Sequence, residues 1–308
     1  MGAQLREYRR RIKSVQSTKK ITRAMELIAA SRIVKAQQRI EASRPYAEAI
    51  TDVVRTVMEQ GSADEHPLIT PRENPSRAAL LLITSDRGLA GGYSANVLRA
   101  GERVTAELRE DGIETVPFLV GRKALSYYRF RGRDTSHTWT GFSEQPSYDN
   151  AREVGDALLE AFLKGGSEDG GVDQIHMVFT RFESMVTQRA TPVKLIPLDT
   201  DEIPDSDGDD SEQGEFKGLI EFEPEGSGVL DALLPRYLTA RVYAAMLDAA
   251  ASEQAARRRA MKSATDNADE LIKSLTRDAN AARQAEITQE IMEIVGGAEA
   301  LAGTGSEM

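Results

Sequence analysis

Two long stretches that lack helix breakers, one at each end of the chain, constrain the fold more than any other feature. From Arg236 to Val295 there is neither glycine nor proline, and from Ala3 to Gln60 the only such residue is Pro45. Because glycine and proline disfavour helix interiors most strongly, the stretches predict two helices of nearly sixty residues. Each would be roughly 85 Å long at a rise of 1.5 Å per residue. Pro45 is expected to kink or divide the first helix.

Apolar residues recur at intervals of three and four along both stretches. The N-terminal stripe has a polar gap at residues 17–20 and comprises Leu5, Tyr8, Ile12, Val15, Met25, Ile28, Ala36, Ile40, Ala47, Ile50, Val54 and Val57. The C-terminal stripe comprises Leu230, Leu233, Tyr237, Arg241, Ala244, Met261, Ala264, Ala268, Leu271, Leu275, Ala279 and Ala282. Since each stripe needs a partner, we predict an antiparallel coiled coil of the two terminal helices. The alanine-rich residues 240–260 would make the second helix slender.

The middle of the chain alternates between strand and helix patterns. Buried strands are expected at Ala78–Thr84, Glu114–Val120 and Ile175–Thr180, with helices at Asn96–Glu110, Arg122–Phe130 and Asn150–Lys164. This alternation predicts a parallel-rich sheet covered by helices, and Val193–Leu198 with Leu219–Phe222 would add a hairpin edge. The predicted fold class is therefore mixed α/β: a Rossmann-like α/β domain inserted into a long antiparallel coiled coil.

The predicted organisation has three parts. An N-terminal coiled-coil helix spans residues 1–60, a globular α/β domain spans 76–222, and a C-terminal coiled-coil helix spans 229–301. Two acidic loops, 165–173 and 199–215, belong to the globular domain. Their composition of glycine and acidic residues is typical of solvated connectors.

Several kinds of chemistry are disfavoured by composition. The chain has no cysteine, which excludes disulfides, thiolate metal sites and cysteine nucleophiles. The three histidines are scattered, so we predict no metal site. Three acidic residues have the spacing of a calcium loop, but Asp210 stands where glycine is needed and Phe216 where glutamate is needed. The three are Asp205, Asp207 and Asp209.

The net charge of −10 conceals a strong asymmetry. Residues 1–44 carry twelve basic and three acidic side chains, a net of +9, whereas the remainder carries −19. The basic arm suits an acidic protein surface, a nucleic acid or an anionic membrane surface. Its apolar stripe and its lack of interleaved aromatic residues disfavour nucleic acid. The longest apolar run, Ala78–Ile83, is too short to span a membrane, and no secretory signal is recognisable, so we expect a soluble intracellular chain.

A glycine-containing loop follows the first predicted strand and has the sequence SDRGLAGGYSAN, residues 85–96. Glycines between a strand and a helix can hold a phosphate, but this pattern is neither GxGxxG nor a P-loop. A tight turn that brings helix and strand together explains it equally well. The residues alone therefore leave open a nucleotide-binding α/β enzyme built around Gly88–Gly92 and a basic-helix adaptor for nucleic acid.

Three segments in order resemble one protein family. They are IKSV with TKKITRAMELIAAS (residues 12–15 and 18–31), TSDRGLAGG (84–92) and ARQAEITQEIMEIVGGA (282–298). On these motifs the whole chain resembles the gamma subunit of F-type ATP synthases, the central rotor shaft. The stretch Gly165–Gly171 looks like an insertion and resembles the extra loop of actinobacterial members.

The resemblance implies a function without chemistry of its own. In this family the coiled coil enters a hexamer of alpha and beta subunits, which hold the nucleotide sites. The globular part lies with the epsilon subunit on the membrane c-ring, and rotation couples proton flow to the catalytic cycle. The chain is thus expected to be non-catalytic, to need no cofactor, and to lie peripherally at the cytoplasmic face of the bacterial cell membrane.

The resemblance also implies which residues contact the stator. The positions at which the family's C-terminal helix makes polar contacts with the stator correspond to Arg283, Gln284, Thr288 and Glu293. Met25 and Arg257 match the positions at which shaft and beta subunit couple.

Overall fold

The computed structural model describes residues 2–59, 66, 68–135, 137–198 and 226–304. In chain order its elements are α1 (Gly2–Glu59), β1 (Arg77–Ile83), α2 (Tyr93–Glu110), β2 (Glu114–Val120), α3 (Arg122–Phe130), β3 (His137–Trp139), α4 (Tyr148–Lys164), β4 (Gln174–Phe182), β5 (Gln188–Ile196) and α5 (Gly226–Thr304). Both long helices are continuous, and Pro45 lies inside α1 without dividing it. The chain forms two compact units, residues 29–257 and residues 1–28 with 258–308.

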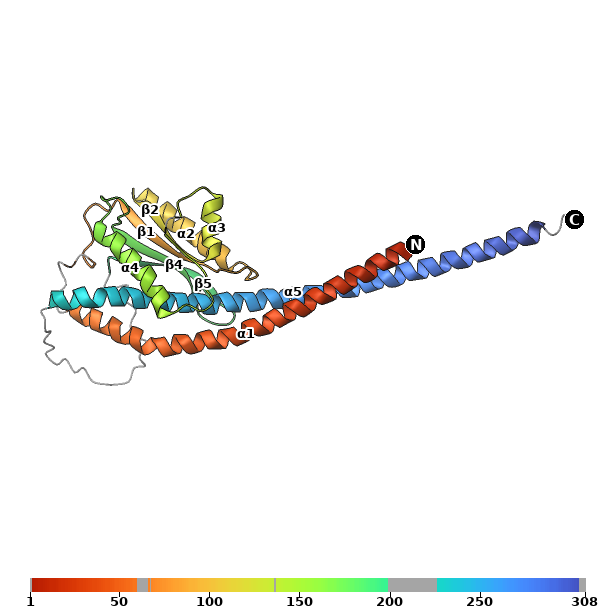
Figure 1. The fold of residues 1–308 in the computed structure, drawn as a ribbon, viewed down its shortest axis with the longest axis horizontal. Coiled ribbons are helices and arrows are strands. Elements are labelled where there is room, and N and C mark those ends of the chain that lie inside the picture. Colours follow the sequence, from red (N-terminus) through yellow and green to blue (C-terminus); the bar gives the residue numbers. More distant parts are fainter. Residues whose placement is uncertain (1, 60–65, 67, 136, 199–225, 305–308) are drawn as a thin grey trace. The chain divides into compact units, whose positions relative to one another are not determined.

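The unit of residues 29–257 contains a five-stranded sheet in the order β3-β2-β1-β4-β5 (Figure 1). The first four strands are parallel, and β5 pairs antiparallel with β4. The parallel-rich sheet is confirmed, but two details differ. The short strand β3 was not predicted, and β5 begins at Gln188 and pairs with β4. Residues 219–222, which were expected to pair with it, lie outside the described residues, as do the connector 199–215 and its calcium-like spacing.

Helices cover both faces of this sheet. On β1, Leu80 and Leu82 face α2 and α3, whereas Ala79, Leu81 and Ile83 face α4 and parts of α1 and α5. A strand that is buried on both faces needs apolar side chains at every position, which explains the uninterrupted apolar run of β1. The sheet is therefore the middle of three layers.

The alanine-rich part of α5 lies inside this unit. Ala245, Ala249, Ala251 and Ala255 are at most 3% exposed, because α5 packs between the sheet layer and α1. The small side chains therefore permit close packing on several sides at once.

The acidic loop 165–173 is held by hydrogen bonds. The Glu168 N–H donates to the Gly165 carbonyl, and the Gly171 N–H donates to that of Glu168. A Cβ on Gly171 would lie 1.9 Å from the Gly165 oxygen, so a side chain there is excluded. Asp173 closes the loop by accepting backbone hydrogen bonds from Ser76 and Gly166.

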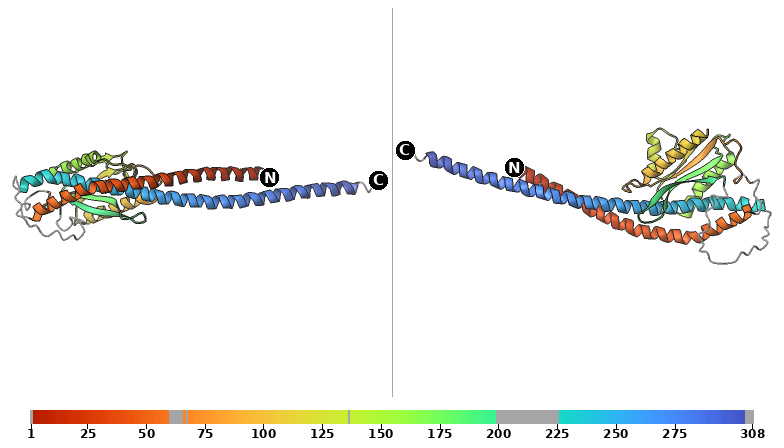
Figure 2. Two further views of the ribbon diagram at one scale, coloured as in Figure 1. Left: turned by 90° about the horizontal axis from the view of Figure 1, so that it is seen from below. Right: turned by 180° about the vertical axis from the view of Figure 1, so that it is seen from behind.

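In the unit of residues 1–28 and 258–308, α1 and α5 lie side by side and antiparallel (Figure 2). The inward positions of α1 continue at intervals of three and four through Ile12, Val15, Lys19, Thr22 and Glu26. The row of inward positions therefore continues through residues 17–20, where a polar gap was predicted, by way of Lys19.

Beyond this gap the predicted stripes are confirmed at most positions, including Val54 and Leu275, and each is wrong at one apolar residue. Ile28 is 52% exposed and Leu271 is 44% exposed, whereas Ala29, Thr265 and Ile272 are turned inward. The strict heptad spacing places polar residues at inner positions, where apolar residues were sought.

Candidate functional site

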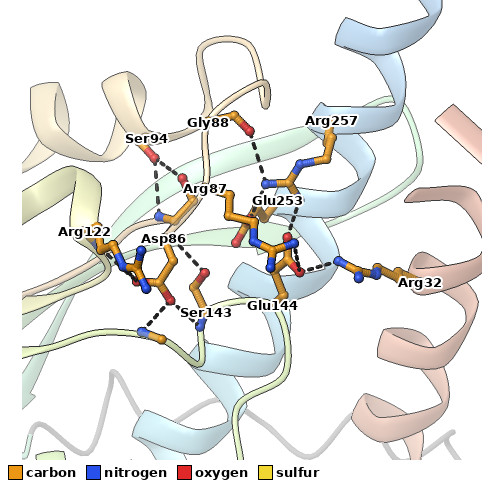
Figure 3. A network of polar contacts seen from close by, with 12 residues as sticks. Arg32, Asp86, Arg87, Gly88, Ser94, Arg122, Ser143, Glu144, Glu253 and Arg257 are labelled. Carbon is orange, nitrogen blue, oxygen red and sulfur yellow. Dashed lines mark hydrogen bonds and ion pairs between the residues drawn. The ribbon is translucent and has the colours of Figure 1, made fainter. Parts of the chain in front are cut away.

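The first candidate place for a ligand is the crevice at the carboxyl ends of the parallel strands. In open α/β sheets, ligands bind where the strand order reverses, which here is between β1 and β4. The Asp86 carboxylate occupies this edge (Figure 3). It accepts N–H hydrogen bonds from Arg122 at 3.1 Å, Gly141 at 2.8 Å and Ser143 at 3.0 Å. The first N–H of α3, which could bind a phosphate, is therefore satisfied by the chain's own carboxylate.

A side chain from α5 lies on the other side of the same loop. Arg257 Nη2 is 2.6 Å from Glu253 Oε1 and donates a 3.4 Å hydrogen bond to the Gly88 carbonyl. The Arg257 side chain is 6% exposed and that of Glu253 is 1% exposed. Burial raises the pKa of Glu253 to about 7, while the neighbouring Arg257 opposes that rise. The glycine loop thus packs against α5, which favours the tight-turn interpretation of Gly88–Gly92.

One carboxylate connects both long helices to this edge. Glu144, in the segment between β3 and α4, accepts a hydrogen bond from Arg32 of α1. It also forms ion pairs with Arg257 at 3.2 Å and with Arg87 at 3.8 Å. We call Arg32, Arg87, Glu144, Glu253 and Arg257 the Glu144 cluster (Figure 3). Sequence reasoning missed it, because its members come from four separate segments and share no spacing.

Polar pairs connect the two helices in the unit of residues 1–28 and 258–308. The Thr22 and Thr265 hydroxyl oxygens are 2.8 Å apart, and both residues are buried. Lys19 Nζ lies 2.5 Å from Asp269 Oδ1. A buried polar pair such as Thr22–Thr265 fixes the register of a coiled coil, since a slip would leave its hydroxyl groups without partners.

The structure places the six expected contact residues in two different environments. Arg257 is buried in the Glu144 cluster within residues 29–257. The other five belong to the unit of residues 1–28 and 258–308. Met25 is partly exposed on α1, and on α5 all four predicted residues are exposed, namely Arg283, Gln284, Thr288 and Glu293. Glu293 Oε1 accepts a hydrogen bond from Gln289 at 2.9 Å. Their predicted contacts with a stator stay predictions.

The end of α5 carries exposed apolar side chains. Every residue from Ile287 to Gly296 is exposed. The large apolar ones are Ile287 at 45%, Ile291 at 55%, Met292 at 70%, Ile294 at 71% and Val295 at 49%. Closely spaced apolar side chains that a chain leaves in water typically mark a surface for a partner.

In the described part of the chain, no group of three or more histidine, aspartate or glutamate side chains could hold a metal ion. No helix there has a segment long and apolar enough to cross a membrane.

Comparison with known proteins decides the family. The family model described as ATP synthase matches residues 4–301. The ATP synthase gamma chain of Acidothermus cellulolyticus is 62% identical over 307 residues, which cover 100% of both chains. This chain belongs to the ATP synthase gamma chain family. The gamma chain of Thermobifida fusca is 56% identical over 309 residues and also covers both chains completely. The predicted resemblance to actinobacterial gamma chains is thereby confirmed.

Solved structures show the same fold. A chain of the Euglena gracilis mitochondrial ATP synthase (OSCP/F1/c-ring, rotational state 3) matches with a TM-score of 0.66 and 19% identity, covering 100% of this chain and 98% of that one. A central stalk/c-ring chain of the Tetrahymena thermophila mitochondrial ATP synthase matches with a TM-score of 0.58 and 22% identity, covering 79% and 99%. The predicted fold class of the gamma chain is confirmed.

Proposed function

We propose that this gamma chain is the central rotor stalk of a proton-translocating F-type ATP synthase. In this role the chain turns with the c-ring and the epsilon subunit, and it drives conformational cycling of the alpha and beta subunits. It performs no chemistry itself and binds no cofactor. It lies peripherally, with the complex, at the cytoplasmic face of the bacterial cell membrane.

The exposed apolar end of α5 carries this proposal. A helix that leaves Ile291, Met292 and Ile294 in water needs a surrounding partner, and the hexamer cavity of the family supplies one. On this helix, we propose that Arg283, Gln284, Thr288 and Glu293 form intermittent polar contacts with alpha and beta subunits. Met25 of α1 is proposed to contact a beta subunit. Few polar contacts suit a rotor, because an extensive interface would hold it at one angle.

The direct test is reconstitution of the full-length chain with alpha and beta subunits. We expect a stable complex that hydrolyses ATP and in which a probe on this chain rotates. Failure of the folded chain to join the hexamer would refute the rotor assignment.

The contacts at the carboxyl ends of the strands disfavour the nucleotide-enzyme alternative, because Asp86 and Arg257 occupy the edge that a nucleotide would need. Titration of the isolated chain with ATP should therefore give no saturable binding at micromolar concentrations. The nucleic-acid adaptor alternative predicts strongly salt-dependent duplex binding. We expect duplex DNA to show no specific binding.

A further inference from the structure

We propose that Glu144 is the joint through which torque passes between the α/β layers and the two long helices. The inference rests on the rotor function proposed above and names the residue that makes the helices turn with the sheet. Glu144 acts by positioning: it holds three arginines, from α1, from α5 and from the loop after β1.

Apolar packing alone does not supply the directional contacts that this task needs. The face of α5 that meets the sheet layer and α4 includes Ala240, Ala245 and Ala249 beside larger side chains such as Leu238 and Met246. Burial of this face resists separation, but the hydrophobic effect is non-directional and by itself fixes no angle about the helix axis. Resistance to rotation requires directional contacts at a distance from that axis.

The Glu144 cluster supplies these contacts. Arg257 extends from α5 and joins Glu144 at 3.2 Å while its other nitrogen binds Glu253 of the same helix at 2.6 Å. The guanidinium is thus held from both sides, with its position on α5 fixed by Glu253. Arg32 binds the second oxygen of Glu144 and connects α1 to the same point.

The segment that contains Glu144 is itself hydrogen-bonded to the loop that follows β1. Ser143, next to Glu144, donates its backbone N–H to Asp86 at 3.0 Å and accepts the Asp86 N–H through its hydroxyl at 2.9 Å. Asp86 follows β1 and also binds the N–H of Arg122, the first residue of α3. A load on either helix therefore reaches strand β1 through ion pairs with Glu144 and then through the charge-assisted hydrogen bond from the Ser143 N–H to Asp86.

The low exposure of Glu144 strengthens its contacts with the arginines. The Glu144 side chain is 16% exposed, so ions and water screen its arginine contacts less than those of a surface pair. Removing one partner of a buried pair leaves an uncompensated charge, which disfavours the original arrangement strongly.

The test uses Glu144→Gln, which keeps the shape and removes the charge. The matched control is Glu160→Gln on α4, which removes the exposed Lys164–Glu160 pair. Each chain is assembled into the complete ATP synthase in vesicles. ATP hydrolysis, protons pumped per ATP, and the angular fluctuation of a rod attached to the α/β layers are measured while the hexamer is stalled.

We expect Glu144→Gln to assemble and hydrolyse ATP, but to pump fewer protons per ATP and to show a larger angular fluctuation. Glu160→Gln should match the wild type in both measurements. If Glu144→Gln assembles with unchanged angular fluctuation and unchanged proton pumping, the proposed role of Glu144 in transmitting torque is refuted, whereas the proposed rotor function stands. Failure of the wild-type chain to assemble or rotate would instead overturn the rotor function and the inference with it.

A second variant covers the case in which Glu144→Gln does not fold. Arg32→Gln changes a side chain that is 33% exposed and leaves the Arg257–Glu253 pair in place. In the full chain, backbone amides at residues 141–145 and 147 should exchange faster with solvent by about 10-fold, because Glu144 loses one of its three arginine contacts. In the complex, angular fluctuation should increase, and Arg32→Lys should restore it. Unchanged fluctuation in Arg32→Gln would overturn the proposal.

Discussion

Replacing Asp173 by asparagine should destabilise the α/β layers markedly at neutral pH. The side chain is 6% exposed and accepts five hydrogen bonds. Oδ2 accepts from the Ser76 N–H at 2.7 Å, the Ser76 hydroxyl at 3.1 Å and the Arg77 N–H at 3.2 Å. Oδ1 accepts from Gly166 at 2.9 Å and Arg72 at 2.8 Å. Since both oxygens face donors, an amide must turn its NH2 group toward at least two of them.

The expected magnitude follows from the charge and from the lost acceptor. Although burial opposes the change, the backbone hydrogen bonds lower the pKa of Asp173 from 3.8 to about 2. A depression of that size corresponds to roughly 2 kcal/mol of folding free energy at neutral pH. Donors left unsatisfied add about 1 kcal/mol or more, which gives roughly 3 kcal/mol for Asp173→Asn.

The pH dependence has a defined sign. Because the pKa is lowered on folding, the contribution of Asp173 is complete above pH 3.8 and is lost as the pH falls toward 2. The difference between wild type and variant should therefore be largest at pH 7 and should shrink below pH 4.

Urea unfolding followed by tryptophan fluorescence provides the assay. Trp139 is the chain's single tryptophan and lies in β3 beside Phe118, so it reports on the α/β layers. The exposed Asp169 of the same loop supplies the control, and Asp169→Asn should unfold like the wild type. Equal urea midpoints for Asp173→Asn and wild type at pH 7 would refute the reasoning.

Three further outcomes can be measured by urea unfolding or by binding to the alpha and beta subunits. Gly121→Ala should cost about 3 kcal/mol, because φ is +94° and a Cβ would lie 2.4 Å from the Thr84 oxygen; Gly112→Ala, at φ +79° with no neighbour within 4 Å, should cost only about 1 kcal/mol. Equal urea midpoints for the two variants would contradict this. Burial raises the pKa of Asp248 to about 6, so wild-type stability falls as pH rises from 4 to 6, and Asp248→Asn should unfold at higher urea concentration at pH 7 but not at pH 4. A lower midpoint at pH 7 would show the carboxylate to be stabilising. Met292→Asp, at a side chain that is 70% exposed, should leave the unfolding of the chain unchanged and weaken its binding to alpha and beta subunits; undiminished binding would count against a role for this surface.

The sequence predicted most of the elements, because their signals are local. Missing helix breakers indicate α1 and α5, and the apolar run Ala78–Ile83 indicates a strand that is buried on both faces. Strand β3 has only three residues, His137–Trp139, which is too short for a periodic signal. The stripe of α1 was wrong at Ile28 because it followed apolar residues alone, whereas the inward positions there are Thr22, Glu26 and Ala29.

The candidate contact residues were less predictable. The exposed positions Arg283 and Thr288 were proposed through the family motif alone, since nothing in the spacing distinguishes them from ordinary surface residues. Glu144 and Arg257 are more than one hundred residues apart, and only the fold brings them together. The uninterrupted heptad spacing across Lys19 and Thr22 was the one local signal that could have located the polar contacts between α1 and α5.

The burial of α5 on several sides also determines which substitutions its middle part can accept. From Tyr237 to Arg257 most side chains are buried against a neighbour, so an additional methylene group in this segment would collide with surrounding atoms. On most helices one side is free to vary and can carry a dye, a tag or a cross-linker. Here random mutagenesis should recover few enlarged residues, and labels for following rotation belong on exposed positions elsewhere, such as Phe130, which is 91% exposed.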